Sequence, residues 1–183
     1  FLSQLSDSPV QSLEVESFGV ISEIKPIMLS LLKGLFDNVT DVRVNYVNVL
    51  SIAEDRGISV KYSYNSSSVS YSNLVKATIK TENFEYSIEA CVLDNKIIKI
   101  TKIMGYQIDV TPIGQMLLIQ NNDIPGVVGK VGNVLGSNNV NIAEFILSRN
   151  SSGSDAYSII KIDDCVSSTI LKELSALDEI IEV

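Results

Sequence analysis

The stretch that decides the fold reads Gln115-Met116-Leu117-Leu118-Ile119-Gln120 and continues as Asn121-Asn122-Asp123-Ile124-Pro125-Gly126. Its first six residues are an apolar run with polar ends, which predicts a β-strand. Asp123 stands where a carboxylate caps a helix and Pro125 suits the first helical position, so a helix is expected from residue 125 to 137. The stretch therefore predicts a strand, a turn and a helix in direct succession.

Glycines punctuate the expected helix. Gly126, Gly129 and Gly132 recur at intervals of three residues and should share one helix face. Each costs roughly 1 kcal/mol of helix propensity relative to alanine. Their clustering predicts that another backbone or a small ligand comes close to this face, although helix packing alone would use the same residues.

The rest of this half completes a βαββαβ order. The expected elements are strands at 140–149, 154–162 and 179–183 and a helix at 167–176, with Ser167 as its cap. This is the order of the ferredoxin-like split β-α-β fold, an antiparallel sheet with both helices on one face. The other face and the edge strand need cover, which a two-fold dimer would supply.

The first half predicts an α/β domain with a mixed sheet. Helices are expected from Pro26 and over 45–56, and the runs that predict strands are 12–23, 58–64, 73–81, 85–93 and 96–103. Residues 1–8 have the character of a helix tail that belongs to a preceding domain, and residues 111–114 that of a linker. The predicted fold class is therefore α+β, with a first domain at 9–110 and a second at 115–183.

Composition limits the classes of function. The chain has 183 residues, 45% of them hydrophobic and 20% charged, which suits two small globular domains. A net charge of −8 without any cluster of lysine and arginine argues against nucleic acid as a partner. We find neither a signal peptide nor a membrane-spanning apolar stretch, and we expect a cytoplasmic protein without a membrane partner.

Chemistry-bearing residues are sparse. The chain has no histidine, no GxGxxG dinucleotide loop and no GxxxxGK[ST] phosphate loop, so we expect no catalytic residues and no cofactor site in it. Cys91 should be buried in a strand and Cys165 exposed, and their separation fits neither a metal site nor a disulfide framework. Lys99 and Lys102, three residues apart, should lie on opposite faces of a strand as solvated charges.

Two parts of the sequence resemble one known family. Residues 121–132, followed by Asn139-Val140-Asn141-Ile142-Ala143, resemble the ACT domain, most of all the one that ends D-3-phosphoglycerate dehydrogenases. Residues 9–113 resemble that family's intervening, allosteric substrate-binding domain; the matching segments are Leu32–Leu35, Val44–Asn48, Ala53–Ile58, Tyr71–Leu74 and Ile103–Tyr106. The resemblance implies a regulatory part of an enzyme of L-serine biosynthesis. It also implies NAD bound elsewhere in the parent enzyme, and a homodimer or homotetramer joined through both domains.

An amino acid as ligand needs an acceptor for its ammonium group and donors for its carboxylate. Asp123 can accept from an ammonium, and the N–H groups of Gly126, Val127 and Val128 at the helix start can donate to a carboxylate. Asn141 offers a donor and an acceptor to a hydroxyl. Without a ligand, Asp123 would serve as a helix cap and Asn141 as the start of a strand, and both interpretations stay open.

The resemblance places the family's serine-contacting positions on Asn121, Asp123 and Asn141. Relatives often carry histidine at the first of these positions and asparagine at the second. The family implies feedback inhibition, in which L-serine bridges two copies by contacting Asp123 of one and Asn141 of the other. Two alternatives remain: the β chain of an iron–sulfur L-serine dehydratase, whose domains have related folds, and an ACT dimerisation module without an effector.

Overall fold

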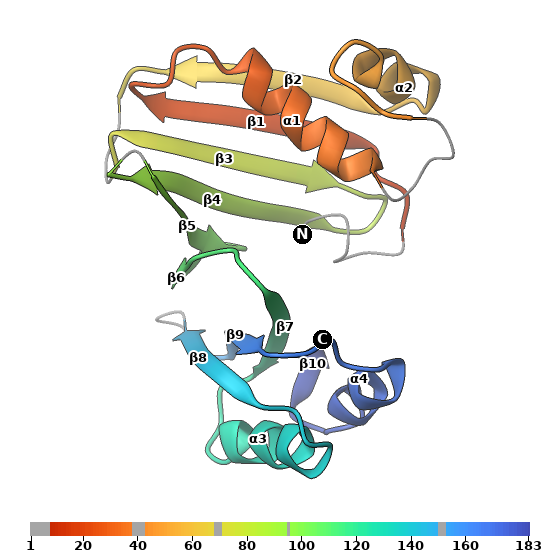
Figure 1. Cartoon of the computed structure of the whole chain (residues 1–183), viewed down its shortest axis with the longest axis vertical. Coiled ribbons are helices and arrows are strands. Elements are labelled where there is room, and N and C mark those ends of the chain that lie inside the picture. Colours follow the sequence, from red (N-terminus) through yellow and green to blue (C-terminus); the bar gives the residue numbers. More distant parts are fainter. Residues whose placement is uncertain (1–7, 38–42, 68–70, 95, 150–152) are drawn as a thin grey trace. The chain divides into compact units, whose positions relative to one another are not determined.

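The computed structural model of this chain contains two compact units. They comprise Phe1–Gly105 and Tyr106–Val183, and the described residues are 8–37, 43–67, 71–94, 96–149 and 153–183. Both units combine helices with strands, which confirms the predicted α+β class (Figure 1). Apart from Ser8, the helix tail predicted for residues 1–8 lies outside the described residues.

A mixed sheet forms the first unit. Its strands are β1 (Ser12–Gly19), β2 (Ser59–Asn65), β3 (Asn73–Lys80), β4 (Glu85–Leu93) and β5 (Ile97–Ile103). The strand order is β2-β1-β3-β4-β5-β6, and β6 (Tyr106–Val110) is where the second unit begins. β1 pairs parallel with β2 and antiparallel with β3, so the predicted mixed sheet is confirmed. The sequence predicts each of these strands except β6.

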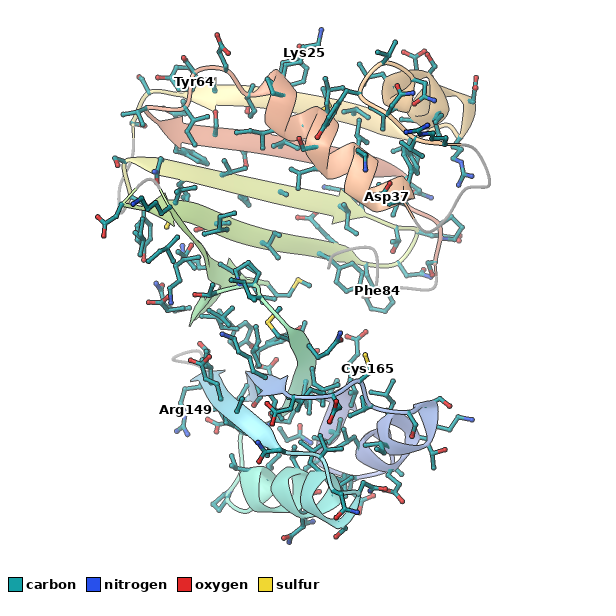
Figure 2. All side chains as sticks on the ribbon, in the orientation of Figure 1. Lys25, Asp37, Tyr64, Phe84, Arg149 and Cys165 are labelled. Carbon is teal, nitrogen blue, oxygen red and sulfur yellow. The ribbon has the colours of Figure 1, made fainter. Side chains whose placement is uncertain are left out.

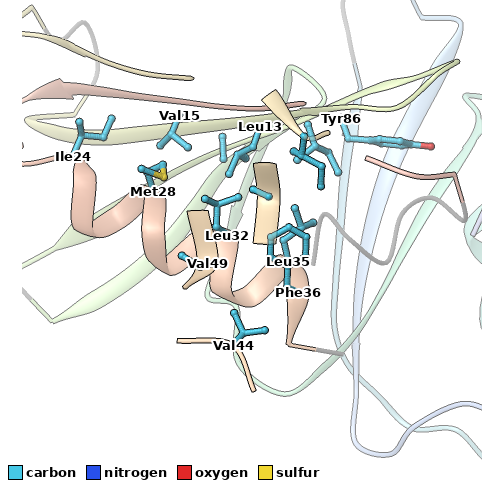
Figure 3. Packing of buried hydrophobic residues seen from close by; sticks show 14 residues of the cluster. Leu13, Val15, Ile24, Met28, Leu32, Leu35, Phe36, Val44, Val49 and Tyr86 are labelled. Carbon is cyan, nitrogen blue, oxygen red and sulfur yellow. The ribbon is translucent and has the colours of Figure 1, made fainter. Parts of the chain in front are cut away.

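Helices α1 (Lys25–Phe36) and α2 (Val49–Asp55) pack on one face of this sheet (Figures 1 and 3). Pro26 stands in the first turn of α1, as predicted. The buried residues of α1 are Met28, Leu32, Leu35 and Phe36. They form a stripe at helical spacing that packs with Leu13 and Val15 of β1, and burial of this apolar area stabilises the unit.

Helix α2 is shorter than the helix predicted over 45–56. Asn45 Oδ1 accepts hydrogen bonds from the backbone N–H groups of Val47 (2.8 Å) and Asn48 (3.0 Å), and Asn48 Oδ1 accepts one from the N–H of Asn45 (2.8 Å). Side chains that satisfy backbone groups in this way compete with the helical pattern, and the helix begins only at Val49. Gly57, at φ 71°, follows the helix end as the predicted stop.

The face of the first sheet opposite the helices carries charged side chains. Glu89 of β4 pairs with Lys102 of β5, and Cys91 pairs with Lys99. Because Glu89 and Cys91 point to one face, Lys99 and Lys102 share that face, and the prediction of opposite faces is wrong. The cause is a register shift between Glu89 and Ala90, a β-bulge that adds one residue on β5 and reverses the alternation of faces.

A four-stranded antiparallel sheet with two helices dominates the second unit. Its elements after β6 are β7 (Gln115–Asn122), α3 (Val127–Ser137), β8 (Ile142–Arg149), β9 (Asp155–Ile162), α4 (Ser168–Ser175) and β10 (Ile180–Glu182). The strand order β10-β7-β9-β8 is that of the predicted ferredoxin-like fold. Ser167 Oγ accepts from the N–H of Ile170 (3.4 Å) and caps α4, as predicted.

Strand β6 covers part of the helix-free face of this second sheet. Its Tyr106, Ile108 and Val110 are all buried, and β6 contacts β8. The ring centroids of Tyr106 and Tyr157 lie 4.6 Å apart. Ile159 shares the face of Tyr157 and is only 1% exposed. The chain therefore supplies some of the cover that the sequence led us to expect from a second copy.

The cysteines lie in the predicted environments. Cys91 is buried. Cys165 is exposed (Figure 2). Across the described ranges, no helix combines the length and the apolar character that a membrane crossing requires. The same ranges contain no group of three or more aspartate, glutamate or cysteine side chains placed to hold a metal ion.

Candidate functional site

A cavity of about 290 Å³ opens where β7 leads into α3. Its lining residues are Asn121, Asp123, Ile124, Pro125, Gly126, Val127, Val128, Leu147 and Arg149. They come from the end of β7, the loop to α3, the first turn of α3 and the end of β8. Five of the six predicted site residues therefore gather at one cavity, and the sixth, Asn141, does not line it.

Strand register sets the floor of this cavity. Asn121 of β7 and Arg149 of β8 both pair with Ala156 of β9, the strand between them. The three residues form one row across the sheet, on the face that packs against α3. Ala156 is fully buried and carries only a methyl group, so the two longer side chains flank an open space. Figure 2 shows Arg149 at the end of β8.

Helix α3 begins two residues later than predicted. Its N-cap is Gly126, at φ 98°, a left-handed conformation that favours glycine, and no side chain hydrogen-bonds to the cap. The prediction that Asp123 caps this helix and that Pro125 is its first residue is therefore wrong. The N–H groups of the first turn keep their partial positive charge without a side-chain cap, and they lie at the cavity.

Asp123 instead faces Arg149. Arg149 Nη2 lies 3.4 Å from Asp123 Oδ1, and the two side chains are 65% and 15% exposed respectively. A mostly buried carboxylate thus stands in the cavity wall, with a guanidinium group at the mouth. The backbone N–H of Asp123 donates to the carbonyl oxygen of Ser154 (3.3 Å), which holds the loop against the start of β9.

Sequence analysis did not name Arg149. Residue 149 comes close to residues 121 and 123 only through the pairing of both outer strands with β9. The sequence signal that could have pointed to Arg149 was the hairpin predicted between strands 140–149 and 154–162. The register of that hairpin determines which residue of β8 lies in the same row as Asn121.

Asn121 supports the loop from beneath. It is 2% exposed, its Nδ2 donates to the carbonyl oxygen of Asn122 (2.8 Å), and its Oδ1 accepts from Ser158 Oγ (3.4 Å). These bonds fix the amide below the loop that carries Asp123. Its predicted contact with an effector stays a prediction.

Asn141 lies just ahead of β8, whereas Arg149 ends that strand. Its side chain is exposed, and its Nδ2 donates to Asp163 Oδ2 (2.6 Å). One copy of the chain therefore does not bring Asn141 together with Asp123. The predicted bridge, in which Asn141 comes from a second copy, stays a prediction.

The glycines of α3 leave an open helix face. Gly126 precedes the helix, so the three predicted glycines do not all share a helical face. A Cβ added at Gly129, Gly132 or Gly136 would meet no other atom within 4 Å. The close neighbour that their clustering predicts is therefore not found among the described residues, and the exposed Val128 lies beside this face (49% exposed).

A second polar group links β6 to the strand beside the cavity. The Asp155 carboxylate accepts hydrogen bonds from Tyr106, from Gln120 Nε2 (2.8 Å) and from Ser154 Oγ (2.9 Å). These donors, Tyr106 foremost, hold the pKa of Asp155 below its ordinary value. Asp155 is therefore an anionic anchor for β6 next to the loop that carries Asp123.

The two folds, in this order, define a two-unit α+β protein with a small cavity in its second unit that carries one group of each charge. Comparison with known proteins makes the assignment specific. The family model for the D-3-phosphoglycerate dehydrogenase intervening domain matches residues 1–104. The chain belongs to the D-3-phosphoglycerate dehydrogenase family.

Curated relatives extend the similarity to the second unit. The chain is 31% identical over 184 residues to D-3-phosphoglycerate dehydrogenase of Bacillus subtilis, covering 100% of this chain and 35% of the relative. The corresponding enzyme of Synechocystis is 32% identical over 177 residues, covering 95% of this chain and 32% of the relative. That of Methanocaldococcus jannaschii is 28% identical over 182 residues, covering 98% and 34%. The chain thus spans about a third of the length of these relatives and corresponds to a regulatory part of such enzymes.

Proposed function

We propose that this chain is the regulatory part of a D-3-phosphoglycerate dehydrogenase and that its second unit is an ACT domain that binds L-serine for feedback inhibition. The observation that carries the proposal is the cavity in which the Asp123 carboxylate stands beside the uncapped start of α3. An α-amino acid presents an ammonium group that suits Asp123 and a carboxylate that suits the N–H groups of Val127 and Val128. Asn121 supports the loop from below.

The site is completed by a second copy of the chain. Asn141 is exposed and lies away from Asp123 in one copy, so it reaches L-serine from the partner and contacts the ligand's hydroxyl. The open face of α3 and the edge position of β8 support such a pairing, because both are available to another chain. Both units take part in a homodimer or homotetramer.

Inhibition follows from differential affinity. L-serine that contacts two copies stabilises the arrangement in which both contacts form, and it shifts the equilibrium only by its preference for that arrangement. Oxidation of the substrate uses NAD bound by other parts of the cytoplasmic enzyme, because these 183 residues contain no GxGxxG dinucleotide loop. The role of this chain is to bind L-serine and to transmit the resulting change of arrangement to the rest of the enzyme.

Calorimetric titration tests the proposal. L-serine should bind saturably at up to one site per chain, and D-serine and glycine should bind more weakly. Asp123→Ala should abolish binding while circular dichroism shows an intact fold, because the ammonium group loses its acceptor. Asp55→Ala, which removes an exposed aspartate at the end of α2 in the first unit, is the matched control and should bind as the unaltered chain does. No heat at millimolar L-serine would favour an ACT dimerisation module without an effector.

A further inference from the structure

The cavity is lined by one negative and one positive side chain, and a zwitterion carries the same two charges. Among its lining residues, Asp123 and Arg149 alone are charged, and they carry opposite signs. The Asp123 carboxylate is mostly buried in the wall, and the Arg149 guanidinium, 3.4 Å away, is mostly exposed at the mouth. The cavity is therefore lined by an ion pair whose arginine side chain is mostly in contact with solvent.

This ion pair contributes little to the fold. An exposed guanidinium is screened by water and pays side-chain entropy to hold one geometry, so such pairs add little stability. At 3.4 Å the pair is also longer than a well-formed charge-assisted hydrogen bond. Arg149 therefore has the freedom to exchange the Asp123 carboxylate for another carboxylate, and its planar fork suits two-point contact with one.

We propose that Arg149 binds the α-carboxylate of the effector, and that a zwitterionic ligand inserts between Arg149 and Asp123 and replaces their ion pair. The inference rests on the proposed function and adds the residue that selects its ligand class. The ammonium group of the ligand takes the place of Arg149 beside Asp123. The carboxylate of the ligand then contacts Arg149 on one side and the first backbone N–H groups of α3 on the other. Free α-amino acids fit this arrangement, whereas the amide of the same amino acid has the ammonium group but no carboxylate to pair with Arg149.

The test compares L-serine with L-serinamide by calorimetry on the whole chain at about pH 6, where both ligands carry an ammonium group. The unaltered chain should bind L-serine at least tenfold more tightly than L-serinamide. Arg149→Gln should reduce this preference by about tenfold, and Arg149→Lys should fall between the two, since lysine keeps the charge but loses the fork. Lys172→Gln, which removes an exposed charge on α4, is the matched control and should leave the preference unchanged.

The preference between two ligands is the deciding quantity because loss of Arg149 also frees Asp123. That release alters the affinity for both ligands alike and cancels in their ratio. If the unaltered chain binds L-serine but Arg149→Gln keeps the same preference, the role of Arg149 is overturned while the proposed function stands. If the unaltered chain binds neither ligand, the proposed function fails and the role of Arg149 fails with it.

Discussion

The two units each cover one face of a sheet with two helices, but they treat the other face in different ways. In the first unit that face carries ion pairs, such as Lys102 with Glu89 (3.1 Å) and Lys76 with Glu16 (3.7 Å). In the second unit it carries Tyr157 and Ile159, which strand β6 helps to bury. A charged face can remain in water, whereas an apolar face needs a covering element. The second unit therefore depends on residues that sequence analysis assigned to the end of the first domain.

The largest effect should come from the covered face itself. Ile159 is 1% exposed, so Ile159→Ala removes buried methyl groups and leaves a cavity, at a cost of about 2–5 kcal/mol in the free energy of unfolding. Ile98, on β5 of the first unit, is 54% exposed, and Ile98→Ala should cost less than about 0.5 kcal/mol. Urea unfolding followed by circular dichroism measures both. Equal costs would show that the second face is not part of a core.

Sequence patterns predicted the elements of the second unit because its strands and helices keep a regular period. The same patterns missed features in which one residue departs from the period. The bulge on β5 reverses the alternation between Lys99 and Lys102, and the left-handed Gly126 moves the start of α3 beyond Pro125. Neither departure changes the apolar spacing, so the period of the pattern does not reveal it; the glycine after Pro125 is a local signal that the period leaves out.

The candidate site was predictable in part for a related reason. The loop from Asn121 to Val128 is local in sequence; Asp123 and the helix start were named from their chemistry, and Asn121 from the family resemblance. Arg149 belongs to the cavity through strand pairing across β9, a contact between distant parts of the chain. Local chemistry can be inferred from neighbours in the sequence, whereas a contact of this kind requires the register of the sheet.

A smaller effect is expected where β6 is anchored. Tyr106→Phe keeps the ring that packs on Tyr157 but removes a hydrogen bond to the Asp155 carboxylate. The cost should be about 0.5–1.5 kcal/mol at neutral pH. Urea unfolding measures it, with Tyr64→Phe as a control in the first unit, where the hydroxyl of a 45% exposed side chain donates to the carbonyl of Gly19 (2.8 Å). A cost as large as that of Ile159→Ala would mean that the hydrogen bond, rather than apolar cover, holds β6 in place.

Acid should weaken the same anchor. The pKa of Asp155 is lowered in the folded chain, so its contribution to stability is present above its unfolded pKa, about 3.9, and is lost as the pH falls through the folded value. Tyr106→Phe should bring the pKa of Asp155 closer to its ordinary value and so flatten this acid dependence. Unfolding titrations from about pH 6 down to about pH 3 measure it. An unchanged slope in the variant would remove Tyr106 from the causes of the shift.

The smallest effect should come from the charged face of the first unit. Lys102 and Glu89 have side chains that are 37% and 21% exposed, and solvent screens their attraction. A double-mutant cycle with Lys102→Gln and Glu89→Gln should give an interaction energy of about 0.2–1 kcal/mol that falls as salt is added. A value above about 2 kcal/mol, insensitive to salt, would indicate a desolvated pair. The two helix-free faces would then both behave as interiors, and the contrast between the units would fail.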